Sequence, residues 1–283
     1  MKIEKATTIG FCFGVKRAMD IVEKTARERS GVETLGTVVH NQQVLEKLAQ
    51  LGVTVVNDVG SIKGSAVVVS AHGVSPKTLD DIRARHIEII DTTCPFVRRA
   101  QVAAQRLAES GFFVIIYGDA NHSEVKGVLG WARENGVATL DENVVASLDP
   151  PPRRVGVLSQ TTQVPAHFAE FAKKLVDCTY TKDSELRIID TICHDIRQRQ
   201  AAAIELASKV DLMFVIGGRN SANTKHLAQL CSVATKTHII ETAEGIQSSW
   251  LKGHDYIGIT AGASTDEQTI NEVWMKLEAM TGS

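Results

Sequence analysis

Short apolar runs alternate with amphipathic stretches along the chain. The runs, such as VVVS at 67–70 and FFVIIY at 112–117, are continuous, which is typical of strands in a parallel sheet covered by helices on both faces. Between the runs, apolar residues recur at helical spacing, as Val15 and Met19 do within 14–29. The pattern predicts an α/β fold with parallel sheets.

The chain contains three similar units, which become visible when Cys12, Cys94 and Cys193 are superposed. An apolar residue follows each cysteine at +3, a basic residue at +4 and a glycine at +24. Polar residues stand at +28 and +30, namely His40, His122 and Ser221, then Gln42, Glu124 and Asn223. From its cysteine, each unit reads as helix, strand, helix, strand, strand, helix, strand. We therefore expect three α/β domains, 8–93, 94–192 and 193–283.

The N-terminal segment predicts how the third domain is completed. Strands are expected before Cys94 and Cys193, but the only candidate before Cys12 is the segment 2–7. The third unit ends with a helix at 266–280 and has no closing strand of its own. We expect residues 1–7 to complete the third sheet, so that the three domains are arranged with pseudo-threefold symmetry.

The repeated cysteines predict a metal centre. Ligands of parallel α/β sheets lie at the loops beyond the carboxyl ends of the strands, where all three cysteines fall. Structural zinc sites normally close four ligands and often use short cysteine pairs, and the sequence has no CxxC. Three thiolates instead suit a cubane iron-sulfur cluster with one iron open to substrate. Cys178 and Cys231 match nothing in the other repeats, so we expect small packing residues, or a partly exposed thiol in the case of Cys178.

A second set of polar residues predicts a binding site for a diphosphate. Imidazole, hydroxyl, amide and backbone N–H groups at helix N-termini suit phosphate oxygens. The sequence has neither a P-loop nor a GxGxxG fingerprint. The residues at equivalent loops are His40, His72, His122, Ser221, Asn223 and Ser264.

Glu124 is a candidate proton donor because it is the only carboxylate at +30, where the other units have Gln42 and Asn223. A purely structural role, as an acid in the first turn of a helix, is the alternative. Thr161 or Thr162 could relay a proton or hold a substrate hydroxyl. Their structural alternative is a helix cap before Pro165.

Composition excludes several classes of function. Lys+Arg 31 against Asp+Glu 33 gives a net charge of -2, and aromatic residues make up 5%, so we expect no nucleic-acid partner. No apolar run approaches the roughly 20 residues that span a bilayer, so we expect no membrane segment. Five scattered cysteines and an N-terminus without an apolar signal region predict a reducing, cytoplasmic setting.

Together, these residues resemble the 4-hydroxy-3-methylbut-2-enyl diphosphate reductase family (IspH, also called LytB) over nearly the whole chain. The matching motifs are GFCFGVKRA, VVHN, SAHGVSP, DTTCP, GDANHSEVKG, SQTTQ, SANT and GAST. The resemblance implies one [4Fe-4S] cluster per subunit, held by Cys12, Cys94 and Cys193 at the centre of the three domains. It also implies an oxidoreductase that makes isopentenyl and dimethylallyl diphosphates in the last step of the non-mevalonate pathway. An external electron donor of the ferredoxin or flavodoxin type would supply the electrons.

The resemblance also assigns roles to the polar residues. Glu124 would protonate the departing hydroxyl, Thr161 would orient it, and His122 would serve both proton delivery and binding. The diphosphate would be bound by His40, His72, His122, Ser221, Asn223 and Ser264. Two positions depart from the family pattern: Ala222 replaces a second serine and leaves only its N–H as a donor, and Asp266 replaces a proline, which predicts a looser last loop.

Two other interpretations remain open at this point. An enzyme of the quinolinate synthase kind would also use three thiolates on a threefold scaffold, but it would condense small carboxylates. A binding protein that holds an iron-sulfur cluster or zinc without turnover belongs to a different class.

Overall fold

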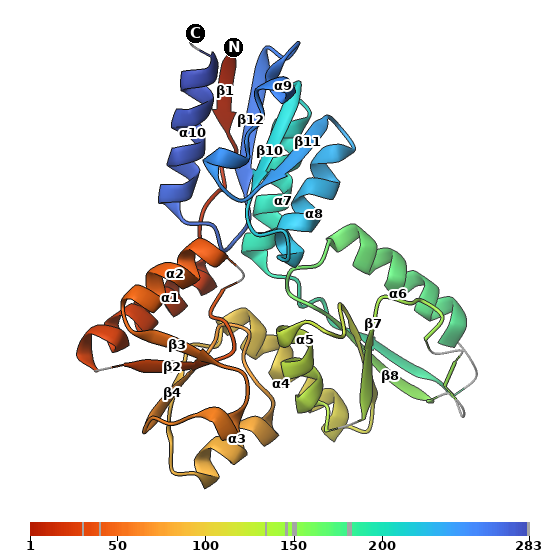
Figure 1. The fold of residues 1–283 in the computed structure, drawn as a ribbon. Coiled ribbons are helices and arrows are strands. Elements are labelled where there is room, and N and C mark those ends of the chain that lie inside the picture. Colours follow the sequence, from red (N-terminus) through yellow and green to blue (C-terminus); the bar gives the residue numbers. More distant parts are fainter. Residues whose placement is uncertain are drawn as a thin grey trace. The chain divides into compact units, whose positions relative to one another are not determined.

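The computed structural model describes residues 1–29, 31–39, 41–133, 135–144, 147–148, 152–179 and 183–281. These residues form three four-stranded parallel sheets with flanking helices, which confirms the predicted α/β class (Figure 1). The helices and strands follow one another in the order expected from each cysteine.

The first sheet has the strand order β3-β2-β4-β5. Its strands are β2 (Val32–Leu35), β3 (Val53–Val56), β4 (Ala66–Val69) and β5 (Glu88–Asp91). The helices of this repeat are α1 (Phe13–Glu28), α2 (Gln42–Gln50) and α3 (Pro76–Ala84), with a 3₁₀ turn at Val59–Ser61. Val67, Val68 and Val69 of β4 are fully buried, as expected for a central strand.

The second sheet repeats this order as β7-β6-β8-β9. Its strands are β6 (Phe113–Tyr117), β7 (Gly136–Thr139), β8 (Arg154–Ser159) and β9 (Glu185–Ile188), and its helices are α4 (Pro95–Glu109), α5 (Ser123–Trp131) and α6 (Pro165–Thr179). Alternate residues of β6 face opposite helices. Ile116 packs with α4 and α5, whereas the Tyr117 ring lies 4.6 Å from that of Phe171 on α6. Helices α4 and α5 therefore cover one face and α6 covers the other.

The third sheet has the order β11-β10-β12-β1. Its strands are β10 (Leu212–Ile216), β11 (Lys236–Ile240), β12 (Tyr256–Ala261) and β1 (Lys2–Lys5), and its helices are α7 (His194–Ala207), α8 (Ala222–Ser232), α9 (Ser248–Leu251) and α10 (Glu267–Thr281), with a 3₁₀ turn at Ala243–Gly245. Strand β1 pairs with β12 in register, Lys2 opposite Tyr256, and so takes the place that β5 and β9 have in the other sheets. The expected pairing of the N-terminal segment with the third sheet is thus present.

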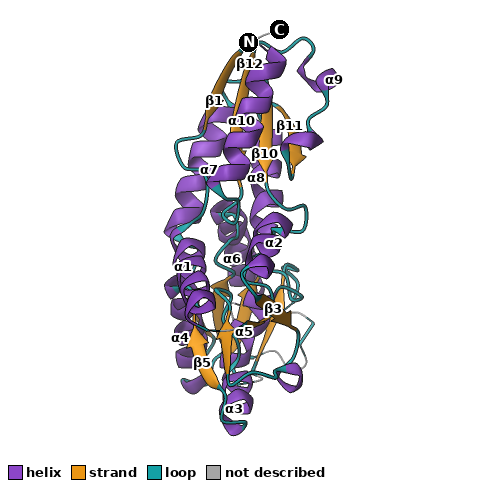
Figure 2. Ribbon diagram, turned by 60° about the vertical axis from the view of Figure 1, so that its left-hand side comes forward, coloured by secondary structure: helices purple, strands orange, loops and turns teal. Residues whose placement is uncertain are grey.

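The core of the third sheet has two sides. Phe214 of β10 packs with Val273 of α10, whereas Met213 and Val215 pack with α7 and α8. Figures 1 and 2 show α10 on one side of this sheet and α7 and α8 on the other. Cys231 is fully buried on the side of the sheet that α7 and α8 cover. This burial raises the pKa of its thiol to about 12, as fits a packing residue. Cys178 is exposed.

The chain divides into two compact units. One contains Met1–Lys16, Val39–Gln50 and His194–Ser283, with the third sheet; the other contains Arg17–Val38 and Leu51–Cys193, with the first and second sheets. The finer division into three domains at 94 and 193 stays a prediction. Within the described ranges, no helix combines the length and the apolar character needed to cross a membrane.

Candidate active site

The three repeated cysteines occupy the same position in the backbone. The Cys94 N–H donates to Ala71 O and the Cys193 N–H to Thr161 O, each at 3.0 Å, and the Cys12 N–H donates to Ala263 O at the same distance. Each acceptor lies just beyond the third strand of its sheet, after β4, β8 or β12. Each cysteine is therefore fixed at the carboxyl edge of a sheet, as the repeat predicts.

Each cysteine also directly precedes a helix. Cys94 is the N-cap of α4, and the carbonyls of Cys12 and Cys94 accept the first helical N–H bonds, from Lys16 and Arg98, at 2.9 Å. Helix N-termini favour thiolates and other anions. Burial raises the pKa of the Cys12 thiol, while the Val15 N–H, 3.4 Å from Sγ, and the charge of Arg199 oppose that shift. The positions suit ligands of an electron-rich metal centre.

Arg199 is a buried arginine that the sequence analysis missed. It is 1% exposed on α7, and its guanidinium donates to Gly10 O at 2.7 Å and to Ala261 O at 3.0 Å. These bonds tie the loop before Cys12 to the end of β12. A signal was present in the sequence, because the equivalent +6 positions of the other repeats hold Ala18 and Ala100.

Replacing Arg199 with glutamine should destabilise the fold. The substitution removes two charge-assisted hydrogen bonds and leaves buried carbonyl groups without their donors, so we expect a loss of about 3 kcal/mol in the free energy of unfolding. Guanidinium unfolding followed by circular dichroism measures this loss. Lys209→Gln, which breaks only an exposed ion pair with Glu205, is the control and should change stability far less. Equal unfolding midpoints for Arg199→Gln and the wild type would contradict the role.

Glu124 and Thr161 form a buried pair in the unit that contains the second sheet. The Thr161 N–H donates to Glu124 Oε1 at 2.7 Å, and the Thr161 hydroxyl donates to Oε2 at 2.8 Å. The side chains are 2% and 5% exposed. The carbonyl of Thr161 accepts the Cys193 N–H, so a single residue connects the acid to a repeated cysteine.

Two local features bring Glu124 to Thr161. Gly118 ends β6 where a Cβ would lie 2.8 Å from the Cβ of Gln160, so only glycine lets this turn approach the loop after β8 closely. His122 then caps α5, because its Nδ1 accepts the Glu124 N–H at 3.2 Å. The cap leaves Nε2 as the donor of the neutral ring, which suits binding of an anion.

His72 lies beside His122, with the two ring centroids 5.4 Å apart. The contact depends on glycines of α5. A Cβ on Gly127 would lie 3.1 Å from Gly73 O, and one on Gly130 would lie 2.3 Å from the Cβ of Ser75. The loop from His72 to Ser75 therefore packs directly on the backbone of α5. The structure thus brings together His72, His122, Glu124 and Thr161.

Burial raises the pKa of Glu124, and the two hydrogen bonds from Thr161 only partly oppose this shift. Folding therefore shifts Glu124 towards its protonated form relative to the unfolded chain. Below the pKa of glutamate in the unfolded chain, near 4.3, the acid is protonated in both states, so the shift does not change stability. As the pH rises above that value, the unfolded chain loses its proton first, so the free energy of unfolding falls until the pH reaches the raised pKa of the folded protein.

Glu124→Gln removes this titration, so its stability relative to wild type should improve as the pH rises. The improvement amounts to about 1.4 kcal/mol for each pH unit between the unfolded and folded pKa values. Thermal unfolding of both proteins from pH 4 to pH 9 measures the difference. A difference that stays constant over this range would show that Glu124 does not titrate with a raised pKa.

The unit with the third sheet holds a second cluster of polar candidate residues. Ser221 is the N-cap of α8, with its hydroxyl accepting the Thr224 N–H at 3.4 Å, and Ala222 begins the helix. Asn223 is 4% exposed, yet neither its side-chain oxygen nor its nitrogen has a hydrogen-bond partner among the described residues. A buried amide of this kind is costly unless a ligand completes its hydrogen bonds.

The loop of Ser264 belongs to the same group. Ser264 O accepts a hydrogen bond from Asn41 Nδ2 at 3.1 Å, and Asn41 Oδ1 caps α2 by accepting the Gln43 N–H at 3.0 Å. The sequence analysis gave Asn41 no role, although a polar residue before a helix pattern is a known cap signal. His40, its neighbour, lies outside the described residues.

Asp266, where the family pattern has proline, is bonded on two sides. Its carboxylate accepts the Thr269 N–H at 3.0 Å and pairs with Lys47 on α2. Burial alone would raise the pKa of Asp266, but the bonds from Lys47 and Thr269 outweigh burial and lower it. An ion pair and a helix cap thus hold this residue, while the expected loosening of the loop stays a prediction.

The candidate residues form two groups, one in each unit. The unit with the third sheet holds Cys12, Ser221, Ala222, Asn223 and Ser264, and the other holds Cys94, Cys193, His72, His122, Glu124 and Thr161. Within either unit, the described residues bring no three His, Cys, Asp or Glu side chains together as a metal site.

Comparisons with known proteins agree on one family. The family model "LytB protein" matches residues 3–278. A 4-hydroxy-3-methylbut-2-enyl diphosphate reductase from Dehalococcoides mccartyi (strain CBDB1) is 58% identical over 281 residues, covering 99% of both chains. The protein of the same name from Trichlorobacter lovleyi is 39% identical over 284 residues and covers 100% of both.

Solved structures give the same result. The E-1-hydroxy-2-methyl-but-2-enyl-4-diphosphate reductase from Plasmodium falciparum is similar with a TM-score of 0.92 and 27% identity, over 98% of this chain and 88% of the other. A second structure, of (E)-4-hydroxy-3-methyl-but-2-enyl diphosphate reductase, has a TM-score of 0.71 and 35% identity over 99% of this chain and 100% of the other. From its cysteine turns to its last helix, this chain belongs to the LytB family.

Proposed function

We propose that this protein converts (E)-4-hydroxy-3-methylbut-2-enyl diphosphate into isopentenyl diphosphate and dimethylallyl diphosphate. The full-length relatives carry the name of this reductase, and one solved relative is described as the terminal enzyme of the non-mevalonate pathway. The reaction consumes two electrons and two protons: the C–O bond to the hydroxyl breaks, water leaves, and the carbon skeleton gains one proton.

The buried pair of Glu124 and Thr161 carries this proposal. A diphosphate reductase of this kind needs an acid that is protonated near neutral pH and lies close to the redox centre. Burial raises the pKa of Glu124, which is the direction that the first need requires, and Thr161, whose carbonyl accepts the Cys193 N–H, connects the acid to a repeated cysteine.

We assign the redox centre to a [4Fe-4S] cluster bound by Cys12, Cys94 and Cys193. The donor set fits this group, because all three residues are thiols, each precedes a helix, and each is held by the same backbone bond. Together the three residues supply three thiolates, the number that leaves one iron of a cubane cluster open. When bound, the cluster supplies the electrons and an iron with an open coordination position.

The polar groups would bind the diphosphate. Asn223 is buried with its amide unsatisfied among the described residues, Ser221 caps α8, and the Ala222 N–H lies at the start of that helix. His122 presents Nε2–H beside His72. Helix N-termini and neutral imidazoles are suitable donors for phosphate oxygens. Ser264 and His40 complete the proposed set.

Glu124 and Thr161 would handle the departing hydroxyl. The Thr161 hydroxyl donates to Glu124, so a substrate oxygen held by Thr161 would lie close to this acid. Glu124 then donates its proton to that oxygen, which leaves as water, and His122 serves the network that returns a proton to Glu124. A cytoplasmic setting fits, because the cysteine ligands stay reduced there. The electrons come from an external carrier.

An anaerobic assay tests the proposal. Cluster-loaded protein is mixed with the allylic diphosphate and a reduced low-potential dye, and the two product diphosphates are separated by chromatography. We expect both products and a brown protein with the electron paramagnetic resonance signal of a reduced cluster. Zinc in place of iron, or a cluster without turnover, would indicate a binding protein. Turnover of small carboxylates alone would indicate an enzyme of the quinolinate synthase kind.

A further inference from the structure

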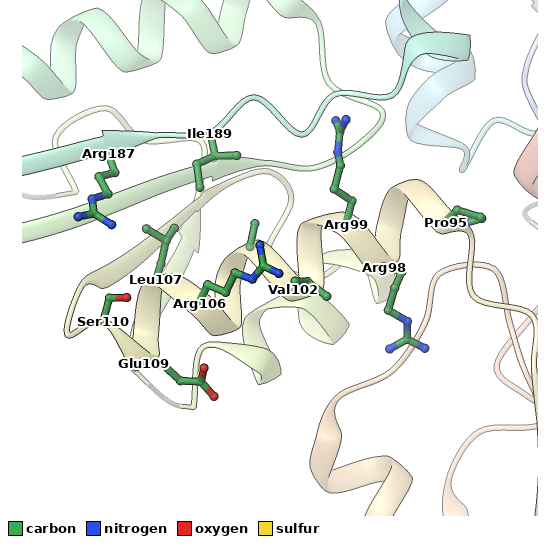
Figure 3. A pocket seen from close by; sticks show the side chains of 11 residues that line it. Pro95, Arg98, Arg99, Val102, Arg106, Leu107, Glu109, Ser110, Arg187 and Ile189 are labelled. Atoms are coloured by element: carbon green, nitrogen blue, oxygen red, sulfur yellow. The ribbon is translucent and has the colours of Figure 1, made fainter.

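A groove of about 850 Å³ lies between helix α4 and the edge strand β9 with the segment that follows it (Figure 3). It is distinct from the polar groups described above. Its floor is apolar, and Ile189 remains 37% exposed at its edge. The apolar side chains that line it are Pro95, Val102, Ala103, Leu107 and Ile189.

Arginines surround this apolar floor. Arg98, Arg99 and Arg106 come from α4 and Arg187 from β9, whereas Glu109 is the single acid among the lining residues. Arg106 makes no ion pair within the described part of the chain, and Arg99 extends across the groove to the carbonyl of Asp190, 3.4 Å away (Figure 3). Arg98 pairs with Asp91 and Arg187 with Glu185, so the positive charge of the groove rests mainly on Arg99 and Arg106. The chain as a whole carries a net charge of -2, so this positive charge is a local feature.

The internal repeat shows that the fold does not require this surface. Helices α1 and α7 hold the positions that α4 holds in the second repeat. The residues equivalent to Arg98, Arg99 and Arg106 are basic in α1 as well, but in α7 they are Arg197, Gln198 and Glu205. In α1 the residue equivalent to Val102 is the charged Asp20. The combination of three basic residues with an apolar floor is thus particular to α4, which points to a role in binding.

The groove begins next to Cys94 and reaches the segment that leads to Cys193. Pro95, which lines one end, directly follows Cys94. Ile189 lies on the segment that leads from β9 to Cys193, four residues later. A protein that docks in the groove would therefore contact the residue after Cys94 and the segment that precedes Cys193.

We propose that this groove docks a small acidic electron-carrier protein, an inference that rests on the proposed function. Each docked carrier is oxidised by one electron, which passes to the cluster beside Cys94 and Cys193, and the oxidised carrier then dissociates. Two such encounters supply the two electrons of one turnover. Arginines around a small apolar patch suit this task, because charge steers the encounter while a limited contact area allows rapid release.

Charge reversal on the groove tests the proposal. The variant Arg99→Glu/Arg106→Glu changes two exposed side chains that have no role in the proposed catalytic or substrate-binding set. The matched control, Lys173→Glu/Lys174→Glu, makes the same change of charge on α6, which covers the opposite face of the second sheet. Folding of both variants is checked by circular dichroism and by the absorbance of the cluster.

Two readouts use a ferredoxin of strongly negative net charge as the probe. In the first, binding of the oxidised ferredoxin to cluster-loaded protein is measured at increasing salt. We expect the groove variant to bind about tenfold or more weakly, the control to bind as wild type, and wild-type affinity to fall with salt. In the second, the groove variant should need a higher concentration of reduced ferredoxin for turnover but keep the wild-type rate with reduced methyl viologen.

Wild-type ferredoxin affinity in the groove variant would overturn the docking proposal, and so would equal weakening by the control. Equally tight binding of a short single-stranded RNA, lost in the same variant, would assign the groove to polyanions in general and also overturn it. Absence of turnover with the viologen dye would contradict the proposed function instead, and the binding readout still decides the docking surface.

Discussion

Glu124→Gln is expected to lower turnover about 100-fold or more while leaving the cluster and the affinity for the diphosphate nearly unchanged. Glutamine has almost the same shape as glutamate and can still accept a hydrogen bond from Thr161, but it has no acidic proton. The hydroxyl of the substrate would then have to leave as hydroxide, a much poorer leaving group than water. Steady-state kinetics with a reduced dye give kcat and KM separately, and cluster absorbance checks loading.

The pH dependence distinguishes a proton donor from a structural acid. Because burial raises the pKa of Glu124 and the protonated form is the reactive one, wild-type kcat should fall as the pH rises through that value. Glu124→Gln should lose this fall and show only its low residual rate. Near-normal kcat in the variant, or an unchanged pH profile, would rule out Glu124 as the proton donor.

Cys94→Ser is expected to yield folded protein that is colourless and inactive. A serine hydroxyl is not deprotonated in the way that a thiolate is, so it binds iron poorly, and two remaining cysteines hold a cubane cluster only weakly. The fold should survive, because the backbone bond from residue 94 to Ala71 O does not involve the side chain. Iron analysis, visible absorbance and circular dichroism measure the three properties.

Cys178→Ser is the matched control, because Cys178 is exposed and has no counterpart in the other repeats. This variant should keep its iron, colour and activity. If Cys94→Ser instead retained a full cluster and normal turnover, Cys94 would not be a ligand, and the assignment of the other two repeated cysteines would lose its basis.

The repeat made much of this site predictable from the sequence. Equal offsets along the chain place residues at equivalent turns, so the common backbone position of Cys12, Cys94 and Cys193 follows from their superposition. The sequence names Glu124 and Thr161 or Thr162 as candidates for proton transfer, whereas the hydrogen bonds between Glu124 and Thr161 come from the structure. The strand pattern predicts that the N-terminal segment completes the third sheet, and the structure adds that it does so beside β12.

Other features depend on burial, which the spacing of residues from the repeated cysteines does not reveal. Arg199 breaks the repeat where alanine stands twice, but only the structure shows that its guanidinium bonds to two buried carbonyls. Asp266 was interpreted by what it replaces, whereas its effect comes from Lys47, more than 200 positions away in the chain. The arginine groove on α4 combines residues of a helix and a distant strand, a combination that no local pattern contains.

The pairing of β1 with β12 also determines when the protein can finish folding. Lys2 lies opposite Tyr256, so β1 must wait during synthesis until the 254 residues that follow Lys2, up to Tyr256, have been added. At typical synthesis rates this wait lasts roughly 10 to 50 s. During that time the waiting segment, KIEK, carries three charged side chains around one isoleucine, which discourages edge-to-edge pairing with other nascent chains. Translation therefore closes this sheet last, and an N-terminal deletion as short as β1 would leave β12 as a bare edge in the finished protein.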